Sequence, residues 1–318
     1  MTRVLVQRIA TVAALAVVAA CGLSGGSRPA AAQGQPHVLF GAWVNKAYAG
    51  QTRRQQILTL ERFLGRKLAI DHEGFFGWKA ALPVTQLRWD VAAGRRPFVA
   101  WHQASSASIV SGAQDSFIRS RALLYKRLGG HIMLAFGPEM DRRTIQGTPQ
   151  QFVAAWTHVR SLFRSVGASN VAFVWCPTAY GFVVGRAQDY YPGDGAVDWV
   201  CADGYNWGSV HPTSRWSSFP EVFAAFLSWS QGHSSVPAVL GEWASIEDPA
   251  QPGRKAAWIN NARLKIEQRY PQLQGLVYFD SISYDATTGA RVDWRANTSQ
   301  SAYDAFRRMA NDPYYTAR

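Results

Sequence analysis

Residues 132–175 read IMLAFGPEMDRRTIQGTPQQFVAAWTHVRSLFRSVGASNVAFVW, and this stretch contains one complete strand–helix–strand unit. Its two apolar runs, 132–136 and 171–175, have the length and near-continuous hydrophobicity of strands that are buried on both faces of a parallel sheet. Between them, Thr148 and Pro149 are the residue types of a helix cap and a first helical position, and they predict a helix that runs to about Val166. Parallel strands connected through a helix are the repeating unit of α/β proteins.

The same alternation of short apolar runs and helical segments recurs from residue 37 to the end of the chain. Eight strands are predicted, and the connections after the second and the fifth strand are less helical than the others. Eight such units fit a closed (β/α)8 TIM barrel, and the first strand lacks the Gly-rich phosphate turn that is typical of an open doubly wound sheet. The predicted strands are 37–44, 68–72, 97–101, 132–136, 171–175, 197–202, 238–241 and 276–279, and the predicted helices are 53–64, 115–128, 149–166, 219–229, 254–270 and 299–309.

Length and composition agree with one large globular domain after a leader. The chain has 318 residues, of which 47% are hydrophobic, so a sizeable core can form and wholesale disorder is excluded. We divide it into an export segment with its tether at 1–32 and a single α/β barrel domain at 33–318. The 13 tryptophans exceed what core packing needs, so some are expected to line a groove where flat rings stack on a flat ligand.

The first 32 residues are typical of an export signal. Arg3 and Arg8 precede an apolar run at 9–20 that is too short to cross a bilayer. Two processing sites stay open. Cys21 follows Val-Ala-Ala in the pattern of a lipobox, which favours lipidation followed by a flexible tether, whereas Ala30 to Ala32 fit ordinary cleavage of a secreted protein.

The net charge of +12 includes three arginines of the leader, Arg3, Arg8 and Arg28. No run of five or six basic residues occurs, so we interpret the remaining charge as a solvated basic exterior and expect no nucleic-acid partner. An anionic glycan or a membrane surface is the alternative partner for such a charge. No Cys/His spacing resembles a zinc site, and we expect no metal, no cofactor and a monomer.

Polar and aromatic residues gather where the predicted strands end. In (β/α)8 barrels the active site forms at these carboxyl ends. Rings that stack on pyranose faces, interleaved with acids and amides that bond hydroxyl groups, indicate a cleft that binds sugars. The expected substrate-binding residues are Trp43, His102, Trp175, Asp203, Asn206, Trp207, Trp243 and Asp280.

Two glutamates at these strand ends, Glu139 and Glu242, are candidates for the chemistry. Glycosidic bonds are cut by paired carboxyl groups, one protonated to supply the leaving oxygen with a proton and one ionised to attack or to activate water. Glu139 follows the fourth strand and Glu242 the seventh, which face each other across the mouth of an eight-stranded barrel. The expected separation is that of a retaining pair, about 5–5.5 Å.

One long motif and three shorter ones resemble glycoside hydrolase family 26, a β-mannanase-type family of retaining (β/α)8 glycosidases. The longest is YYPGDGAVDWVCADGYNW at 190–207, which is similar to the family signature YPG-D-x-x-VDW-x-G-x-DGYN. The stretch 171–177 resembles the family's fifth strand, 240–242 its nucleophile strand and 138–140 its acid/base strand. The resemblance extends from about Phe40 to Phe306.

The resemblance implies a role for individual residues. Glu139 would be the general acid/base, and Glu242 would be the nucleophile that forms a glycosyl-enzyme intermediate. Tyr205 would hydrogen-bond Glu242 and help to keep it ionised, since a phenol that donates to a carboxylate favours the charged form. His102 would touch the sugar at the point of cleavage.

The chain departs from the family pattern around its acid/base strand. The family's Arg-Pro-x-His before Glu-Met-Asn is replaced here by Ala-Phe-Gly-Pro, and Asp141 stands where the Asn is usual. Arg142 and Arg143 follow, in place of Gly-x-Trp, and the eighth strand has Phe279 near the position of a usual Trp platform. These changes concern the substrate more than the reaction: the two arginines either favour an anionic glycan or are simply exposed on a shortened loop.

Two further groups of residues allow alternatives. Export permits a disulfide between Cys176 and Cys201, but adjacent parallel strands bridge badly, so two buried thiols are the favoured interpretation. Asp71, His72 and Glu73 end the second strand, where successive side chains point to opposite faces and are not expected to share one ion. We interpret Asp71 and Glu73 as hydrogen-bond partners of a sugar or as polar contacts of the barrel rim.

These observations predict an exported retaining endo-β-glycosidase that hydrolyses a polysaccharide, a β-mannan or a related β-glycan, by double displacement. Its location would be the cell envelope, through a lipid anchor at Cys21, or the medium. A non-catalytic glycan-binding barrel in cell-envelope or exopolysaccharide assembly is the alternative, and the altered acid/base strand is its main support. A transglycosylase would share the same site and differ in its acceptor.

Overall fold

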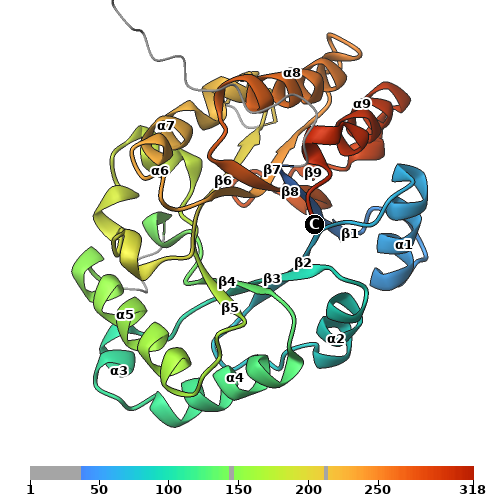
Figure 1. Cartoon of the computed structure of the whole chain (residues 1–318). Helices are drawn as coiled ribbons and strands as arrows, with labels where there is room; N and C mark the ends of the chain where they lie inside the picture. Colours follow the sequence, from blue (N-terminus) through green and yellow to red (C-terminus); the bar gives the residue numbers. More distant parts are fainter. Residues whose placement is uncertain (1–36, 143–146, 211–213) are drawn as a thin grey trace, which may run out of the picture. The chain divides into compact units, whose positions relative to one another are not determined.

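The computed structural model describes residues 37–142, 147–210 and 214–318, and in this part of the chain eight parallel strands close into a barrel (Figure 1). Each of these strands pairs with the next along the chain, and the first pairs with the eighth, which closes the barrel. The strands are β1 (Leu39–Asn45), β2 (Ile70–Phe76), β3 (Arg96–Trp101), β4 (Ile132–Phe136), β5 (Val171–Trp175), β6 (Trp199–Asn206), β7 (Ala238–Ser245) and β8 (Leu273–Tyr284).

Helices surround the barrel and connect its strands (Figure 1). The predicted (β/α)8 fold is therefore confirmed. None of the helices among the described residues is long and apolar enough to span a bilayer. The helices are α1 (Arg53–Leu64), α2 (Val84–Ala92), α3 (Ser106–Val110), α4 (Asp115–Leu128), α5 (Pro149–Ser165), α6 (Ala179–Val183), α7 (Phe219–Gln231), α8 (Arg254–Arg269) and α9 (Gln300–Asn311).

The helix starts follow from local sequence. Thr52, Thr148 and Ser218 cap α1, α5 and α7, and each is followed three residues later by a Gln or Glu that bonds back to the cap. Such capping boxes satisfy two N–H groups that a helix start leaves without partners. The connection after β2 contains the nine-residue helix α2, which its weak helical pattern does not predict, whereas the short α6 agrees with the expected loop-like connection after β5.

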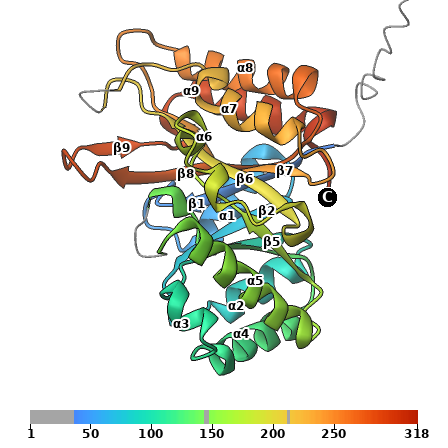
Figure 2. The same ribbon diagram turned by 90° about the vertical axis from the view of Figure 1, so that its left-hand side faces the viewer.

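Several strands run further than their apolar runs predict. β6 continues to Asn206, β7 to Ser245 and β8 to Tyr284. Most of the extra residues of β6 and β7 are buried, and they keep the parallel pairing, as between Asn206 and Ser245. A further strand, β9 (Arg291–Asp293), folds back antiparallel on the end of β8, and this hairpin projects from the barrel in Figure 2. Hydrophobicity predicts only the apolar run of each strand, whereas the ladder continues through polar residues toward the mouth.

The buried residues form two separate apolar clusters. Residues on one face of each strand fill the barrel interior, for example Ile70, Phe98 and Val239. Residues on the other face pack against the helices in a larger layer, for example Val99 and Leu240. Since side chains alternate along a strand, this division decides which residues at the strand ends can reach the mouth and which are buried under a helix.

Candidate active site

The first predicted carboxyl residue, Glu139, lies in the turn that follows β4. Its backbone N–H donates to the carbonyl oxygen of Cys176 (2.8 Å), and the N–H of Gly137 donates to the carbonyl oxygen of Trp101 (2.8 Å). Glu139 has a φ of 52°, a left-handed conformation that is uncommon and costly for a residue with a Cβ. Segments on both sides therefore hold Glu139 in a strained conformation, which is typical of functional sites.

The second predicted carboxyl residue, Glu242, lies within β7 and is 5% exposed. It pairs with Asp203 of β6 next to a register shift between the two strands. Gly241 precedes it, and a Cβ at this glycine would lie 2.6 Å from the Cys201 Sγ and 2.7 Å from the Asp203 Oδ1. A side chain at position 241 would therefore clash with these neighbours. Glycine at this position lets the strand that carries Glu242 lie close to β6.

Tyr205 of β6 makes the contact that the resemblance implies, because its hydroxyl donates to Oε2 of Glu242. Burial, followed by the charges of Glu242 and Asp203, raises the pKa of Tyr205 well above its usual value. The phenol therefore keeps its proton and stays a hydrogen-bond donor. It supports the ionised form of Glu242, which is the form that a nucleophile needs.

The carboxyl groups at the mouth influence one another. Burial is the main cause that raises the pKa of Glu242 to about 8; the hydrogen bond from Tyr205 lowers this pKa, and the charge of Glu139 raises it further. Burial also raises the pKa of Asp203 well above its usual value, and the charges of Glu242 and Glu139 add to this effect. Asp203 and Glu242 lie side by side, so the ionised form of one disfavours the ionised form of the other.

The aromatic side chains form an arc along one side of the mouth. His102 lies 6.0 Å from Phe75, which lies 5.0 Å from Trp43, measured between ring centroids. The arc continues from Trp43 to Phe279 at 4.6 Å and from Phe279 to Tyr205 at 5.5 Å. Of the residues predicted to bind substrate, Trp43 and His102 belong to this arc, and both are half-buried.

Trp207 extends the arc beyond Tyr205. The two ring centroids are 6.0 Å apart, and Trp207 is half-buried. Trp294 packs behind both, 4.8 Å from each ring, and is itself 1% exposed. Trp294 could not be predicted from the sequence, because it follows β9, a strand that is too short and too polar to be recognised.

The prediction that Trp175 and Trp243 bind substrate is wrong. Trp175 and Trp243 are fully buried. Trp175 packs against Tyr191 and Trp229 in the helix layer, with ring centroids 4.8 and 5.3 Å away, and Trp243 packs against Trp258 at 5.5 Å. Both occupy strand positions whose side chains point outward from the barrel, so neither ring can stack on a sugar.

Two predicted polar contacts with substrate are wrong for the same reason. Asn206 is fully buried; its side-chain amide donates to Ser245 and accepts from the backbone N–H of Ser217. Asp280 is 1% exposed and accepts from the backbone N–H of Ala296 at 2.7 Å. Both side chains stabilise the loops behind the mouth. Asp203 is also buried, at 6% exposure, but it lies beside Glu242.

The expectation of two buried thiols is wrong, because Cys176, directly after β5, and Cys201, near the start of β6, form a disulfide. Both residues point into the barrel interior, and their exposure is 1% and 0%. The disulfide packs against Gly241 and against the carboxyl group of Asp203, whose Oδ1 lies 3.3 Å from the Cys176 Sγ. A covalent link therefore forms the floor under the mouth.

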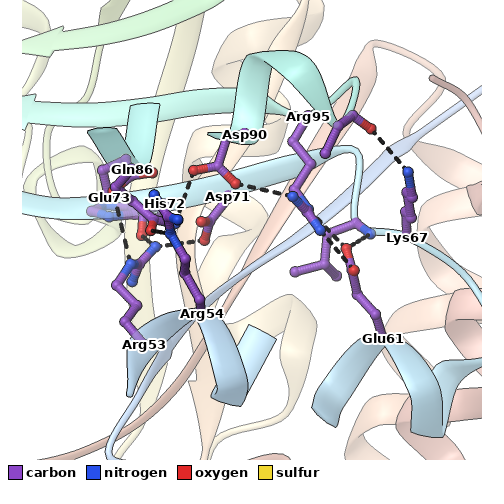
Figure 3. A network of polar contacts seen from close by, with 12 residues as sticks. Arg53, Arg54, Glu61, Lys67, Asp71, His72, Glu73, Gln86, Asp90 and Arg95 are labelled. Atoms are coloured by element: carbon purple, nitrogen blue, oxygen red, sulfur yellow. Dashed lines mark hydrogen bonds and ion pairs between the residues drawn. The ribbon is translucent and has the colours of Figure 1, made fainter. Parts of the chain in front are cut away.

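Asp71 and Glu73 do not reach the mouth either. They point outward from β2 into a buried polar cluster under α1 and α2, so the sugar-binding alternative is wrong for both (Figure 3). Their carboxyl oxygens and those of Asp90 lie within 4.8 Å of one another, close enough for a metal ion. Arg53, at 2.6 Å from Asp71, and Arg95, at 3.3 Å from Asp90, already supply positive charge there.

The residues that depart from the family pattern have separate roles. Asp141 accepts from the backbone N–H of Thr178 (2.8 Å) and from its hydroxyl, and so ties the turn after β4 to the start of α6. The Arg142 Nη1 lies 3.4 Å from Oε1 of Glu139, and its side chain is 61% exposed. Arg142 also lines a surface cavity of about 660 Å³ together with Arg186 and Tyr190. Arg143, like the leader at 1–32 with Cys21, lies outside the described residues.

The chain is similar in sequence to endoglucanase H of Acetivibrio thermocellus, with 29% identity over 287 residues. The alignment covers 84% of this chain and 30% of the longer protein, so the chain spans less than a third of that relative. No protein-family model matches the chain.

Solved structures of family 26 enzymes have the same fold. The catalytic domain of an endo-β-1,4-mannanase from Bacillus sp. JAMB-750 superimposes with a TM-score of 0.64 at 13% identity, covering 87% of this chain and 86% of that one. A β-mannanase from Bacteroides ovatus gives 0.59 at 16% identity, covering 87% and 89%. GH26C from Muricauda sp. MAR_2010_75 gives 0.58 at 13%, covering 88% and 85%. The chain is a (β/α)8 barrel that resembles glycoside hydrolase family 26, as its strand motifs predict.

Proposed function

We propose that this chain is a retaining endo-β-glycosidase that cuts a polysaccharide at the mouth of its barrel. The observation that carries the proposal is the hydrogen bond from Tyr205 to Glu242, with Glu139 close enough for its charge to raise the pKa of Glu242. A buried carboxylate with a phenol donor, paired with a second and more exposed glutamate, has the composition of a nucleophile and an acid/base.

The reaction follows from these assignments. A Glu242 oxygen attacks the anomeric carbon while Glu139 gives its proton to the departing glycosidic oxygen, which leaves a glycosyl ester on Glu242. Glu139, now ionised, then takes a proton from water as the water oxygen attacks the same carbon. The ester bond breaks, Glu242 is free again, and the configuration at the anomeric carbon is retained. No redox change or cofactor enters this sequence.

The substrate class is proposed from the site and from the relatives. The half-buried rings of Trp43, Trp207 and His102 suit a flat sugar face and its hydroxyl groups. The relatives are named as an endoglucanase and as β-mannanases, so β-glucans and β-mannans are the first polysaccharides to test. Residues 33–318 incubated with each of these, and with xylan and bacterial exopolysaccharides, should release oligosaccharides whose masses identify the cut.

The test of the reaction uses an activated fluorosugar, 2,4-dinitrophenyl 2-deoxy-2-fluoro-β-cellobioside or the β-mannobioside. We expect covalent labelling at Glu242, located by peptide mass. Glu242→Gln should abolish labelling, and Glu139→Gln should lower polysaccharide hydrolysis by about 10²- to 10⁴-fold. The Glu139→Gln variant should lose much less activity on a dinitrophenyl glycoside, because that leaving group needs no proton. Absence of labelling in the wild-type chain would contradict the assignment.

A non-catalytic glycan-binding barrel is the second candidate. The altered sequence before Glu139 favours it, because Ala135 and Pro138 stand where the family pattern has its Arg and His. The strained backbone of Glu139 favours the enzyme instead, because such strain is typical of active sites. Binding of a polysaccharide by the wild-type chain, with no product and no labelling, would support this candidate.

We also propose that the protein is exported and attached to the cell envelope through lipidated Cys21, as its leader sequence indicates. The mature N-terminus distinguishes the two processing sites. Lipidation predicts a diacylated peptide that begins at Cys21, and ordinary cleavage predicts an unmodified peptide that begins at Gln33. Mass spectrometry of the protein from its native membrane fraction and medium decides between them.

A further inference from the structure

A histidine that the reaction scheme does not use lies inside the barrel beside Glu242. His72 is carried by β2, is 1% exposed, and its ring lies between Trp43 and Phe98, whose centroids are 5.3 and 4.9 Å away. Its Nε2 is 3.7 Å from Oε1 of Glu242. Among the described residues, this Oε1 accepts no hydrogen bond, whereas Oε2 is bonded by Tyr205.

The tautomer of His72 is fixed by its own strand. Nδ1 lies 3.0 Å from the backbone N–H of Gly74, and because an N–H can only donate, Nδ1 is the acceptor and carries no proton. The ring proton of the neutral imidazole is therefore on Nε2, which faces Glu242. A register shift between His72 and Gly74, with a φ of 110° at Gly74, accompanies this hydrogen bond.

The ring stays neutral throughout the working range of pH. The pKa of His72 is lowered to about 3, mainly by burial and in second place by the charge of Arg53. His72 therefore offers Glu242 a hydrogen-bond donor that does not become a cation. A neutral donor can orient a carboxylate without the strong pairing that would reduce its reactivity as a nucleophile.

The backbone of His72 is held from behind the barrel wall. Arg53 of α1 donates through Nη2 to the carbonyl oxygen of His72 (2.7 Å) and to Oδ1 of Asp71 (2.6 Å), as Figure 3 shows. The Arg53 Nε also lies 3.8 Å from Oε2 of Glu73. The residues on both sides of His72 thus contact one half-buried guanidinium, so the ring has a defined position relative to Glu242.

We infer that His72 is a positioning residue for Glu242: its Nε2–H donates to Oε1, while Tyr205 donates to Oε2, and the two donors together fix the plane of the carboxylate. This inference rests on the proposed role of Glu242 as nucleophile. The separation of 3.7 Å is longer than a formed hydrogen bond, and such contacts at active sites often shorten when substrate is bound. A nucleophile that must approach one face of a sugar ring gains rate from this orientation.

Two variants of His72 separate a positioning role from a packing role. His72→Gln keeps a side-chain N–H at nearly the same reach, and His72→Phe keeps the ring but has no donor. Phe163→Leu is the matched control, because Phe163 is a buried ring of α5 that packs against Trp101 and Tyr125 in the helix layer. The readouts are the rate at which Glu242 is labelled by the fluorosugars named above, kcat and KM on the polysaccharide that is cut, and the pH profile of kcat/KM.

We expect His72→Phe to lower the labelling rate and kcat by about 10- to 100-fold with KM nearly unchanged, and His72→Gln to recover most of this loss. The groups that face Glu242 are Tyr205 and Asp203 on β6, Glu139 after β4 and His72 on β2. Loss of one donor destabilises the ionised form of Glu242, so the acid limb of the kcat/KM profile should move to higher pH by about one unit. Phe163→Leu should lower Tm and leave the acid limb in place.

The outcomes distinguish this inference from the proposed function. A wild-type chain that is not labelled at Glu242 contradicts the proposed function. If the wild-type chain is labelled, the role of His72 is tested separately. That role alone is overturned if His72→Phe is labelled at the wild-type rate and its acid limb does not move. Equal losses in His72→Gln and His72→Phe also overturn it. If His72→Phe does not fold, His72→Gln is the deciding variant. A wild-type labelling rate and a wild-type acid limb in His72→Gln support the inference. A tenfold loss of the labelling rate in His72→Gln overturns it.

Discussion

Two groups of buried carboxyl residues lie on opposite faces of the barrel wall and have different surroundings. In the group at the mouth, Glu242 has neutral donors beside it, the phenol of Tyr205 and the imidazole of His72. The helix-layer cluster under α1 and α2 contains two guanidinium groups, and Arg95 lies 2.7 Å from Glu61. The mouth carboxylates are Glu139, Asp203 and Glu242, and the helix-layer cluster consists of Arg53, Glu61, Asp71, Glu73, Asp90 and Arg95.

The difference shows what each group contributes. A buried carboxylate beside an arginine is neutralised where it stands, and its removal leaves an unpaired charge that the fold must tolerate. A carboxylate held by neutral donors is not paired with a cation and can react once it is ionised, at a cost in stability that grows when the group ionises. The helix-layer cluster should therefore determine stability, and the mouth carboxylates should determine rate.

The largest effect on stability is expected from the helix-layer cluster. Arg95→Ala removes the partner of Glu61 and Asp90 and should lower the free energy of unfolding by about 3–5 kcal/mol, measured by urea denaturation at pH 7. Activity per folded molecule should be kept at low temperature. Arg215→Ala, which breaks an exposed pair with Glu221, is the control and should leave the midpoint nearly unchanged. Equal losses of unfolding free energy in the two variants would contradict the expectation that the helix-layer cluster determines stability.

The next largest effect is expected on the rate of hydrolysis and not on stability. Tyr205→Phe removes the donor to Oε2 of Glu242 and should lower kcat/KM by about 100-fold. Since this hydrogen bond lowers the pKa of Glu242, its loss should raise that pKa and move the acid limb of the kcat/KM profile to higher pH. The urea midpoint should change little. A rate loss without any movement of the acid limb would mean that Tyr205 acts on the sugar and not on Glu242.

The stability of the mouth should depend on pH with a defined sign. The pKa of Glu242 is about 8 in the folded chain and near 4.5 when the chain is unfolded, so the folded state binds more protons between these values. Unfolding therefore becomes easier as the pH rises from about 5 to 8. Glu242→Gln cannot ionise, and its Tm should exceed that of the wild type by more at pH 8 than at pH 5, at roughly 2–4 °C per kcal/mol. A difference that is constant with pH would show that Glu242 does not titrate in this range.

The smallest effect is expected at the exposed edge of the mouth. Arg142→Ala breaks a surface pair with Glu139 and should change kcat/KM on a neutral β-glycan by less than about fivefold. If the cavity lined by Arg142 and Arg186 binds an anionic glycan, the same variant should lose at least tenfold on that polymer. Parallel measurements on a neutral and an acidic polysaccharide decide between the two interpretations of this arginine.

The barrel itself could be predicted from the sequence because buried parallel strands and capped helices have strong local patterns. The runs at 132–136 and 171–175 coincide with β4 and β5, and the helix predicted at 115–128 coincides with α4. Glu139 and Glu242 could be placed because each follows such a run directly. α2 could not, since its stability comes mainly from packing of the buried Leu87 and Asp90 against the barrel and not from a regular apolar stripe.

The errors at the site have one physical origin. Trp175 and Trp243 stand at strand ends, but both side chains point outward. Alternation from the interior residue Cys176 places Trp175 outward, whereas Trp243 follows a register shift in β7 that alternation alone does not predict. Alternation also predicts that His72 points inward when Asp71 and Glu73 point outward. The hydrogen bond from Gly74 to His72 could not be predicted, because it depends on a register shift that no residue pattern specifies.

The disulfide under the mouth has a consequence for how opening of the barrel can be followed. Both sulfurs are buried in the interior, and residues 37–318 contain no other cysteine, so only one pairing is possible there. A reductant in solution can reach Cys176 and Cys201 only after β5 and β6 separate from their neighbours. The rate at which free thiols appear under dithiothreitol, trapped with an alkylating agent, therefore measures how often the closed barrel opens, and a bound polysaccharide that bridges these strands would slow this rate.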